Sequence, residues 1–271
     1  MARPAEVFVR PVSMTEGRRL QRIGRTAKDP VRLRRAIVVL MSAQEQSAPD
    51  IAHLLDCSPE TWKASTDPDF IAKMRRVLDL YDHPPADGRV VCADEFGPLN
   101  LQPRPGRAWR PTAHPARLRA TYRRTGGVRH MIAALDLPTG QMTYRIRERK
   151  RWREFLAFLK LLRSRWPAQK LYLIADNFSP HKHPKVTGWA ANNNVELVFL
   201  PTYSSWLNWI EPEFTALRYF TFSGTDHRTH AWQGEMVDRY MRWRNARAQP
   251  KTNFAAESGV RTWTGYQTNA A

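Results

Sequence analysis

The chain has 271 residues, of which 42% are hydrophobic and 11% aromatic, and its formal net charge is +18. These values indicate a globular protein with one sizeable core and a smaller appendage, and they exclude wholesale disorder. The surplus of 43 Lys and Arg residues over 25 Asp and Glu residues favours a nucleic-acid partner, because Arg grips phosphate bidentately.

Membrane and disulfide-rich classes are disfavoured as well. No apolar stretch approaches the roughly 20 residues that span a bilayer, and the first residues lack the apolar core of a signal peptide. The two cysteines, Cys57 and Cys92, have no ligand spacing, which argues against a zinc module or a disulfide framework. We therefore expect a cytoplasmic protein.

Residues 1–64 are predicted to form a small helical domain. Asp29 and Pro30 have the residue types of an N-cap and a first helical turn, and residues 31–41 follow with apolar positions at helical spacing. A short helix over 47–56, a tight turn and a newly capped helix from Ser58 come next. This order predicts a helix-turn-helix DNA-binding region, and an ordinary helical bundle is the alternative.

Residues 65–88 are predicted to be a linker that contains a helix. Turn residues at 66–69 end the preceding helix early, and a helical period resumes over 70–81. Two prolines at 84–85 and an Asp-Gly pair at 87–88 then mark a boundary to the next domain.

Residues 89–225 are predicted to form a mixed sheet flanked by helices. The strands are expected at 89–94, 107–110, 128–135, 141–146, 170–175 and 195–200, with a hairpin turn at 138–140. The helices are expected at 152–166, at 183–192 and from Asn208 onwards. Consecutive strands followed by alternating helices and strands predict an α/β, RNase H-like fold. Residues 226–271 are expected to add a helix over 230–247 and a loose tail.

Three acidic residues follow apolar runs in this region. Asp94 ends the run 89–94, Asp176 ends the run 171–176, and Glu211 comes after a third run and a turn. A carboxylate at the end of a buried strand is not needed for packing, and α/β folds keep their chemistry at strand ends. Three such carboxylates on a basic chain predict metal-dependent chemistry on a polyanion.

The metal expected at these carboxylates is Mg²⁺, which prefers hard oxygen ligands. Two such ions roughly 3.5–4 Å apart stabilise the attacking and leaving oxygens of a phosphoryl displacement. We predict that Asp94 bridges the ions from a central strand and that Asp176 lies beside it if the two strands are neighbours. Glu211 is predicted to come from a helix, with Asn208 one turn earlier on the same face.

Other acidic residues near these three have competing interpretations. Glu95 is expected to point away from Asp94, in a surface or salt-bridge role. Glu213 is the alternative to Glu211, and it is disfavoured because it lies off the Asn208 face. Asp136 also ends a strand, but the Leu-Pro-Thr-Gly sequence after it favours a turn residue.

Two further polar residues follow Asp176. Asn177 is expected to lie near the metal. His181, five residues after Asp176, is predicted either to contact the substrate or to cap a helix, and the sequence does not decide between these roles.

Clusters of basic residues flank the predicted sheet and are interpreted as a DNA track. Trp109 and Trp152 lie among them, where stacking on bases or on Arg is feasible. The residues chosen as DNA-binding candidates are Arg104, Arg107, Arg110, Arg123, Arg124, Arg147, Arg149, Lys150 and Arg151.

The acidic motifs resemble those of the DDE-type transposases of bacterial insertion sequences, within the mariner superfamily. The motifs are VCADEFGP at 91–98, IADN at 174–177 and LPTYSSWLNWIE at 200–211. The separation of Asp176 and Glu211, 34 intervening residues, is the one expected of that branch. The resemblance covers residues 61–247 closely and the N-terminal helices more loosely.

The resemblance implies an RNase H-like core that holds two Mg²⁺ or Mn²⁺ ions on Asp94, Asp176 and Glu211. It also implies hydrolytic nicking of double-stranded DNA at transposon ends, followed by strand transfer by the freed 3′-hydroxyl. Family members act as dimers or larger assemblies on paired terminal repeats and favour TA targets. A protein of this kind is expected to be nucleoid-associated when bound to DNA.

The sequence departs from the family pattern at two places. Trp209 stands where many relatives have Pro, a change expected to alter packing rather than metal ligation. The chain also passes from Glu60 directly into the segment near Thr61, so that a second DNA-reading unit is expected to be missing, as in an internally shortened copy. The rival functions are a noncatalytic transposase-derived DNA-binding protein and a hydrolytic nuclease of the same fold.

Overall fold

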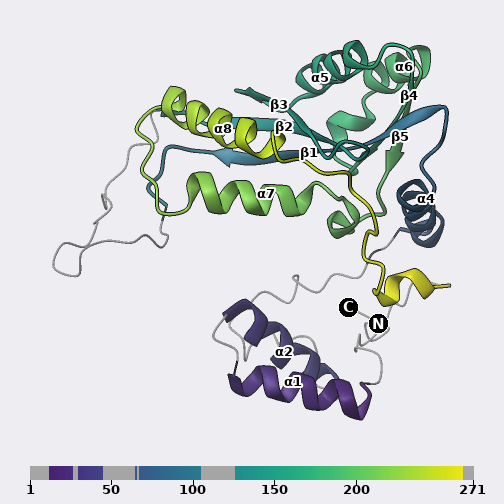
Figure 1. Cartoon of the computed structure of the whole chain (residues 1–271), viewed down its shortest axis with the longest axis vertical. Coiled ribbons are helices and arrows are strands. Elements are labelled where there is room, and N and C mark those ends of the chain that lie inside the picture. Colours follow the sequence, from purple (N-terminus) through teal and green to yellow (C-terminus); the bar gives the residue numbers. More distant parts are fainter. Residues whose placement is uncertain (1–11, 27–29, 45–64, 66, 105–125, 265–271) are drawn as a thin grey trace, which may run out of the picture. The chain divides into compact units, whose positions relative to one another are not determined.

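The computed structural model describes residues 12–26, 30–44, 65, 67–104 and 126–264 (Figure 1). The chain divides into two compact units, one formed by residues 72–261 and the other by residues 1–71 and 262–271. In the described parts of the chain, no helix is long and apolar enough to cross a membrane.

The N-terminal unit contains two helices, α1 (Met14–Thr26) and α2 (Pro30–Ser42). Ser13 and Glu16 cap the start of α1 reciprocally, because each side chain accepts a hydrogen bond from the other residue's backbone N–H, at 3.3 and 3.0 Å. α2 begins at Pro30 and matches the helix predicted over 31–41. The predicted helices over 47–56 and from Ser58, on which the helix-turn-helix depends, lie outside the described residues.

A five-stranded sheet in the order β3-β2-β1-β4-β5 forms the centre of the larger unit. β1 pairs antiparallel with β2, and β2 pairs antiparallel with β3, whereas β1, β4 and β5 run parallel. The strands are β1 (Gly88–Leu99), β2 (Arg129–Asp136), β3 (Met142–Arg147), β4 (Lys170–Ala175) and β5 (Val195–Phe199). The predicted mixed sheet is thereby confirmed, while the strand predicted over 107–110 lies outside the described residues.

Helices cover both sides of this sheet, with α5 and α6 on one side and α7 on the other (Figure 1). The regular helices are α4 (Phe70–Asp82), α5 (Trp152–Arg165), α6 (Pro184–Asn192), α7 (Glu211–Leu217) and α8 (His230–Asn245). The shorter turns are η3 (Ser179–Lys182), η4 (Ser205–Leu207), the π-helical η5 (Arg218–Phe222) and η6 (Gly259–Thr262).

The alternation of side chains along β1 assigns its residues to the two sides. Val91 and Ala93 belong to a buried cluster with Phe155 and Leu159 of α5. Phe96 lies on the opposite side, with its ring 5.3 Å from the ring of Phe214 in α7. Because successive residues of a strand point to opposite faces, β1 is buried on both.

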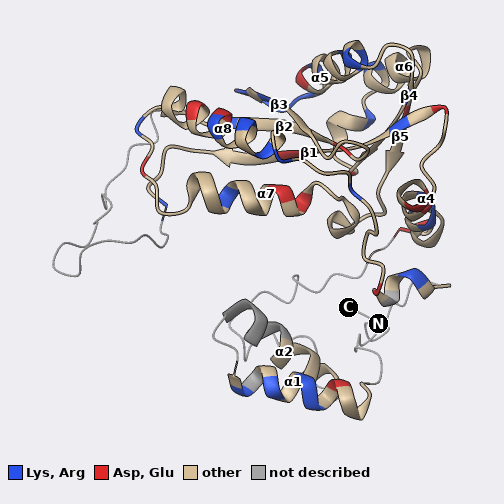
Figure 2. Cartoon of the chain, in the orientation of Figure 1, with Lys and Arg blue, Asp and Glu red and all other residues tan. Residues whose placement is uncertain are grey.

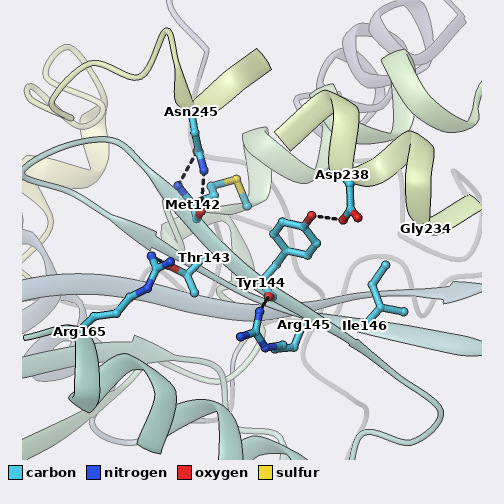
Figure 3. Close-up of a pocket in the computed structure, with 9 residues that line it drawn as sticks. All are labelled: Met142, Thr143, Tyr144, Arg145, Ile146, Arg165, Gly234, Asp238 and Asn245. Atoms are coloured by element: carbon cyan, nitrogen blue, oxygen red, sulfur yellow. Dashed lines mark hydrogen bonds between the residues drawn. The ribbon is translucent and has the colours of Figure 1, made fainter. Parts of the chain in front are cut away.

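α8 packs along the edge strand β3 through polar contacts (Figure 3). The Asn245 amide donates to the Met142 carbonyl and accepts from the Met142 N–H, both at 2.8 Å. The Tyr144 hydroxyl donates to the Asp238 carboxylate. These contacts border a pocket of about 420 Å³ that Arg145 and Arg165 also line. The C-terminal helix is therefore an integral part of the larger unit.

Most predicted element boundaries agree with the structure to within two residues, but two differ. The first strand was predicted to end at Asp94, and that is wrong because β1 pairs with β2 as far as Leu99, beyond its last pair with β4 at Cys92. The third acidic motif differs as well. Asn208 was expected to begin a helix, and that prediction is wrong because α7 begins at Glu211. Pro212 is the reason for the later start, since proline is tolerated in the first turn of a helix and disfavoured further in. Asn208 instead ends the short turn η4 in an extended conformation.

Candidate active site

Asp94 lies on the central strand. It points to the same face as Phe96, two residues later, and this is the face covered by α7. Its side chain is nearly buried, with 9% of the residue exposed. The Glu95 N–H donates to Asp94 Oδ1 at 2.7 Å, and the Asn208 amide donates to Asp94 Oδ2 at 3.2 Å and to the Ala93 carbonyl at 3.0 Å. Asn208 therefore fixes both the carboxylate and the strand that carries it.

Asp176 follows directly after β4, the parallel neighbour of β1. The last paired residues of the two strands are Cys92 and Ile174, so Asp94 and Asp176 each come two residues later. The two strands are neighbours, which is the condition under which Asp176 was expected beside Asp94. Because both carboxylates come two residues after the last pair of these parallel strands, they lie together where the β1–β4 pairing ends.

Glu211 is the first residue of α7. Its N–H donates to the Asn208 carbonyl at 3.1 Å, so that one asparagine contacts the strand of Asp94 through its side chain and Glu211 through its backbone. Asn208 was predicted to share a helical face with Glu211. It lies outside the helix, yet it still connects these two carboxylates.

The three carboxylates influence one another electrostatically. Burial, together with the negative charges of Asp176, Glu95 and Glu211, raises the pKa of Asp94 to about 7. Burial and the charge of Asp176 also raise the pKa of Glu211, against the opposing effect of Arg218. Such mutual repulsion is what a bound cation relieves.

The oxygen atoms of the site fit a hard divalent cation, although the side chains are not arranged around a single metal position. Within the described residues, no group of three or more His, Cys, Asp or Glu side chains is arranged to hold a metal ion. Burial and neighbouring carboxylates nevertheless raise the pKa values of Asp94 and Glu211, and the buried Oδ1 of Asn208 has no hydrogen-bond partner among these residues. Carboxylate and amide oxygens are ligands that Mg²⁺ and Mn²⁺ accept.

His181 lies between two carboxylates and caps no helix. It belongs to η3, while the residue that caps α6 is His183. His181 Nε2 is 2.8 Å from Glu95 Oε1, and its Nδ1 is 2.9 Å from Asp176 Oδ1. Burial alone would lower the pKa of His181, but the hydrogen bonds to the two carboxylates raise it to about 9. The sequence did not predict this arrangement.

Glu95 adopts the salt-bridge alternative and not the surface one, because its side chain is only 7% exposed. The other two acidic residues considered from the sequence are Asp136 and Glu213. Asp136 has the turn role expected, because it accepts a hydrogen bond from Thr139 in the turn after β2, and it pairs with Arg89 at 2.7 Å. Glu213 pairs with Arg244 and Lys251, both at 2.8 Å. Glu213 therefore neutralises structural cations, which leaves Glu211 as the carboxylate of α7 directed to the site.

The remaining residues around the third motif support its position. The Asn177 amide donates to the Leu200 carbonyl at 2.5 Å, which connects the end of β4 to the segment after β5. The Tyr81 hydroxyl donates to the Leu207 carbonyl at 2.8 Å. Trp209 packs its ring 5.0 Å from the rings of both Tyr81 and Phe254. The tryptophan that departs from the family pattern thus makes aromatic packing contacts.

The basic candidates fall into different settings. Arg104 is half-buried, with its guanidinium 5.3 Å from the Phe222 ring, and Arg151 pairs with Glu154 at the start of α5 at 2.6 Å. The Lys150 Nζ is 4.4 Å from the Phe178 ring. Against the effect of burial, hydrogen bonds from His181 and the Phe178 N–H lower the pKa of Asp176, and the charge of Lys150 adds to their effect. Arg147 and Arg149 are exposed. Arg107, Arg110, Arg123 and Arg124 lie outside the described residues.

Comparisons with known proteins identify the family. The sequence profile of the DDE superfamily endonucleases matches residues 89–230, more than half of the chain. The protein therefore belongs to the DDE superfamily of endonucleases, as the acidic motifs had indicated.

A curated relative carries the name "Insertion element IS630 uncharacterized 39 kDa protein" and comes from Shigella sonnei. It is 27% identical over 174 residues, which are 62% of this chain and 48% of the relative. The chain thus spans about half the length of the curated relative that it matches.

Solved structures of the Mos1 mariner transposase share the fold. The Mos1 strand transfer complex gives a TM-score of 0.50 at 14% identity, over 89% of this chain and 74% of Mos1. The Mos1 paired end complex with Mg gives 0.51 at 16% identity, over 94% of this chain and 84% of Mos1. This likeness supports the predicted RNase H-like architecture.

Proposed function

We propose that the protein is a DNA transposase that cleaves the ends of an insertion sequence and joins them to target DNA. Asp94, Asp176 and Glu211 would hold two Mg²⁺ or Mn²⁺ ions. The observation that carries the proposal is the closeness of Asp94, which is only 9% exposed, to Asp176 and Glu211, because burial and the negative charges of these neighbours raise the pKa of Asp94. Membership of the DDE superfamily of endonucleases supports the same chemistry.

The divalent ions would activate the nucleophile and stabilise the charge that develops on the phosphate oxygens during in-line displacement. The residues of the chain would position the carboxylates that hold these ions. Asp94 is held at both oxygens by the Glu95 N–H and the Asn208 amide, so the position of its carboxylate is set before DNA binds. The Asn208 carbonyl in turn accepts from Glu211 at 3.1 Å, which orients the first turn of α7.

The DNA substrate would be bound by the basic residues around this edge. Lys150 acts electrostatically on Asp176, and the exposed Arg147 and Arg149 belong to the same segment. The N-terminal unit contributes further basic residues along α1 (Figure 2). The Mos1 structures are paired end and strand transfer complexes, including forms with Mn and with Mg. By analogy, we propose that this protein acts on paired DNA ends as a homodimer in the bacterial cytoplasm.

The experiment that tests this function uses the purified full chain and labelled DNA that carries the ends of its own insertion element. Cleavage and joining are followed on gels in Mg²⁺, in Mn²⁺ and in EDTA. Asp94→Asn is the inactive variant. Asp136→Asn is the matched control, because Asp136 is also a buried acid, the last residue of β2, but it pairs with Arg89 at 2.7 Å.

Metal-dependent joining that is lost in Asp94→Asn and kept in Asp136→Asn supports a transposase. Cleavage without joined products assigns a hydrolytic nuclease. DNA binding without cleavage in either metal assigns a noncatalytic, transposase-derived DNA-binding protein, and the proposal is then wrong.

A further inference from the structure

A buried Glu–His pair lies beside the proposed metal site and has no role in the chemistry described so far. The side chains of Glu95 and His181 are 7% and 1% exposed, and Glu95 Oε1 is 2.8 Å from His181 Nε2. The other ring nitrogen, Nδ1, is 2.9 Å from Asp176 Oδ1. One imidazole therefore connects a glutamate of β1 to the aspartate that follows β4.

The surroundings of His181 fix the plane of its ring. The Phe155 ring of α5 lies against it at a centroid distance of 4.0 Å, and the edge of Phe178 approaches it at 5.6 Å. The backbone N–H of His181 donates to the Phe178 carbonyl at 2.9 Å, which anchors the backbone of His181. Turning the ring would break the Phe155 contact and both carboxylate contacts, so packing and the two carboxylates together set its orientation.

The position of Glu95 in the strand makes the arrangement informative. Glu95 shares its side of β1 with Val91 and Ala93, which are core residues. A carboxylate at such a position is costly unless a partner compensates for its burial. The compensating partner is His181, whose other nitrogen contacts Asp176. Two adjacent residues, Asp94 and Glu95, thus contact the same site from opposite faces of one strand.

We propose that Glu95 and His181 are positioning residues for Asp176. Glu95 accepts a hydrogen bond from His181 Nε2 and so fixes the imidazole, and Nδ1 then holds Asp176 Oδ1, which leaves the second oxygen of that carboxylate for the divalent ion. The inference rests on the proposed function, since it requires Asp176 to be a metal ligand. Groups that orient a ligand typically change metal affinity by about 10–100-fold when they are removed.

The test measures Mn²⁺ binding by the full-length chain, with free Mn²⁺ followed by electron paramagnetic resonance. Thermal unfolding in EDTA is measured in parallel, so that loss of affinity is separated from loss of fold. The variants are His181→Ala, Glu95→Ala, Glu95→Gln and Asp176→Asn. Asp136→Asn, which breaks a buried ion pair with Arg89, serves as the control for a nonspecific loss of stability.

We expect His181→Ala and Glu95→Ala to weaken Mn²⁺ binding by about 10–100-fold. Glu95→Gln should restore much of the affinity, because the amide oxygen still accepts a hydrogen bond from Nε2, and Asp136→Asn should bind as wild type does. If His181→Ala does not fold, the comparison of Glu95→Ala with Glu95→Gln provides the same test.

Two results would overturn the inference and locate the fault differently. Wild-type Mn²⁺ affinity in His181→Ala and Glu95→Ala, with affinity lost in Asp176→Asn, would show that Asp176 is a ligand that needs no positioning. Wild-type affinity in Asp176→Asn would contradict the proposed function itself, and the positioning role would fail with it.

Discussion

Two kinds of buried or partly buried carboxylate occur in the same domain, and their surroundings differ. Glu213 and Asp136 each pair with a cation, at 2.8 Å from Arg244 and 2.7 Å from Arg89, and the pKa of Glu213 is lowered despite its burial. Asp94 and Glu211 form no ion pair within the described residues, and burial raises the pKa of both. A paired carboxylate has its charge compensated by a cation of the fold, whereas an unpaired one keeps charge that an added cation would compensate.

The difference explains why acidic residues with similar sequence settings have different roles. Asp94 and Asp136 both lie on strands and are 9% and 4% exposed. Burial therefore does not distinguish them. What distinguishes them is the neighbouring guanidinium, which Asp136 has and Asp94 lacks. The experiments below compare the unpaired group with the paired group.

The largest expected effect follows from removing an unpaired carboxylate. Asp94→Asn should reduce DNA cleavage by about 10³-fold or more, because a metal contributes several kcal/mol of charge stabilisation in the transition state and each 1.36 kcal/mol is tenfold in rate. Single-turnover cleavage measures the loss. If Asp94→Asn cleaved DNA at a rate within tenfold of wild type, the unpaired carboxylates would have no catalytic role that the paired ones lack.

Breaking a pair should instead affect stability. Glu213→Ala leaves Arg244, which is 9% exposed, without its carboxylate, and we expect unfolding free energy to fall by about 3 kcal/mol. Urea denaturation of the full chain measures this change. An unaltered midpoint would mean that the Glu213–Arg244 pair contributes nothing to the fold.

Added metal should stabilise the wild-type protein through the unpaired group. At 100 times the dissociation constant, Mn²⁺ should add about 2.7 kcal/mol to the unfolding free energy by mass action. The gain should be absent in Asp94→Asn and retained in Asp136→Asn, as thermal unfolding with and without Mn²⁺ would report. Equal gains in all three proteins would indicate that Mn²⁺ binds elsewhere.

The smallest expected effect extends the comparison to cations. The guanidinium of Arg151 pairs with Glu154 at 2.6 Å, whereas the exposed Arg147 guanidinium donates to the carbonyl of its neighbour Ile146 at 3.1 Å. Arg147→Ala should lower the slope of log affinity against log salt for duplex DNA by about one, and Arg151→Ala should leave it nearly unchanged. Fluorescence anisotropy over a salt series measures both slopes, and the reverse ranking would contradict the assignment.

Much of the sheet could be predicted from the sequence because buried strands leave a strong apolar signal. β4 occupies Lys170–Ala175, the range expected from its apolar run, and it pairs with β1, which is the condition under which Asp176 was expected beside Asp94. The three candidate carboxylates follow these runs, so their approach was predictable from topology. Their hydrogen-bond partners depend on side-chain placement, which periodicity does not specify.

The salt-bridge alternative for Glu95 was foreseen, but its burial was missed for a physical reason. Alternation predicts that Glu95 points away from Asp94, and in a sheet with one solvated face that direction is the surface. β1 is the central strand and is covered on both faces, so the residue that points away is also buried. The signal that was available is the position of Glu95 two residues after Ala93, in the same alternation as the core positions Val91 and Ala93.

The central claim is that Asp94, Asp176 and Glu211 are metal ligands, and anomalous scattering from Mn²⁺ tests it most directly. Crystals of the full chain soaked in Mn²⁺ would be measured at the manganese absorption edge, beside crystals of Asp94→Asn. The account predicts an anomalous peak in contact with the Asp94 and Asp176 carboxylates that disappears in the variant. No peak at these residues in the wild-type protein, or a peak unaffected by Asp94→Asn, would contradict it.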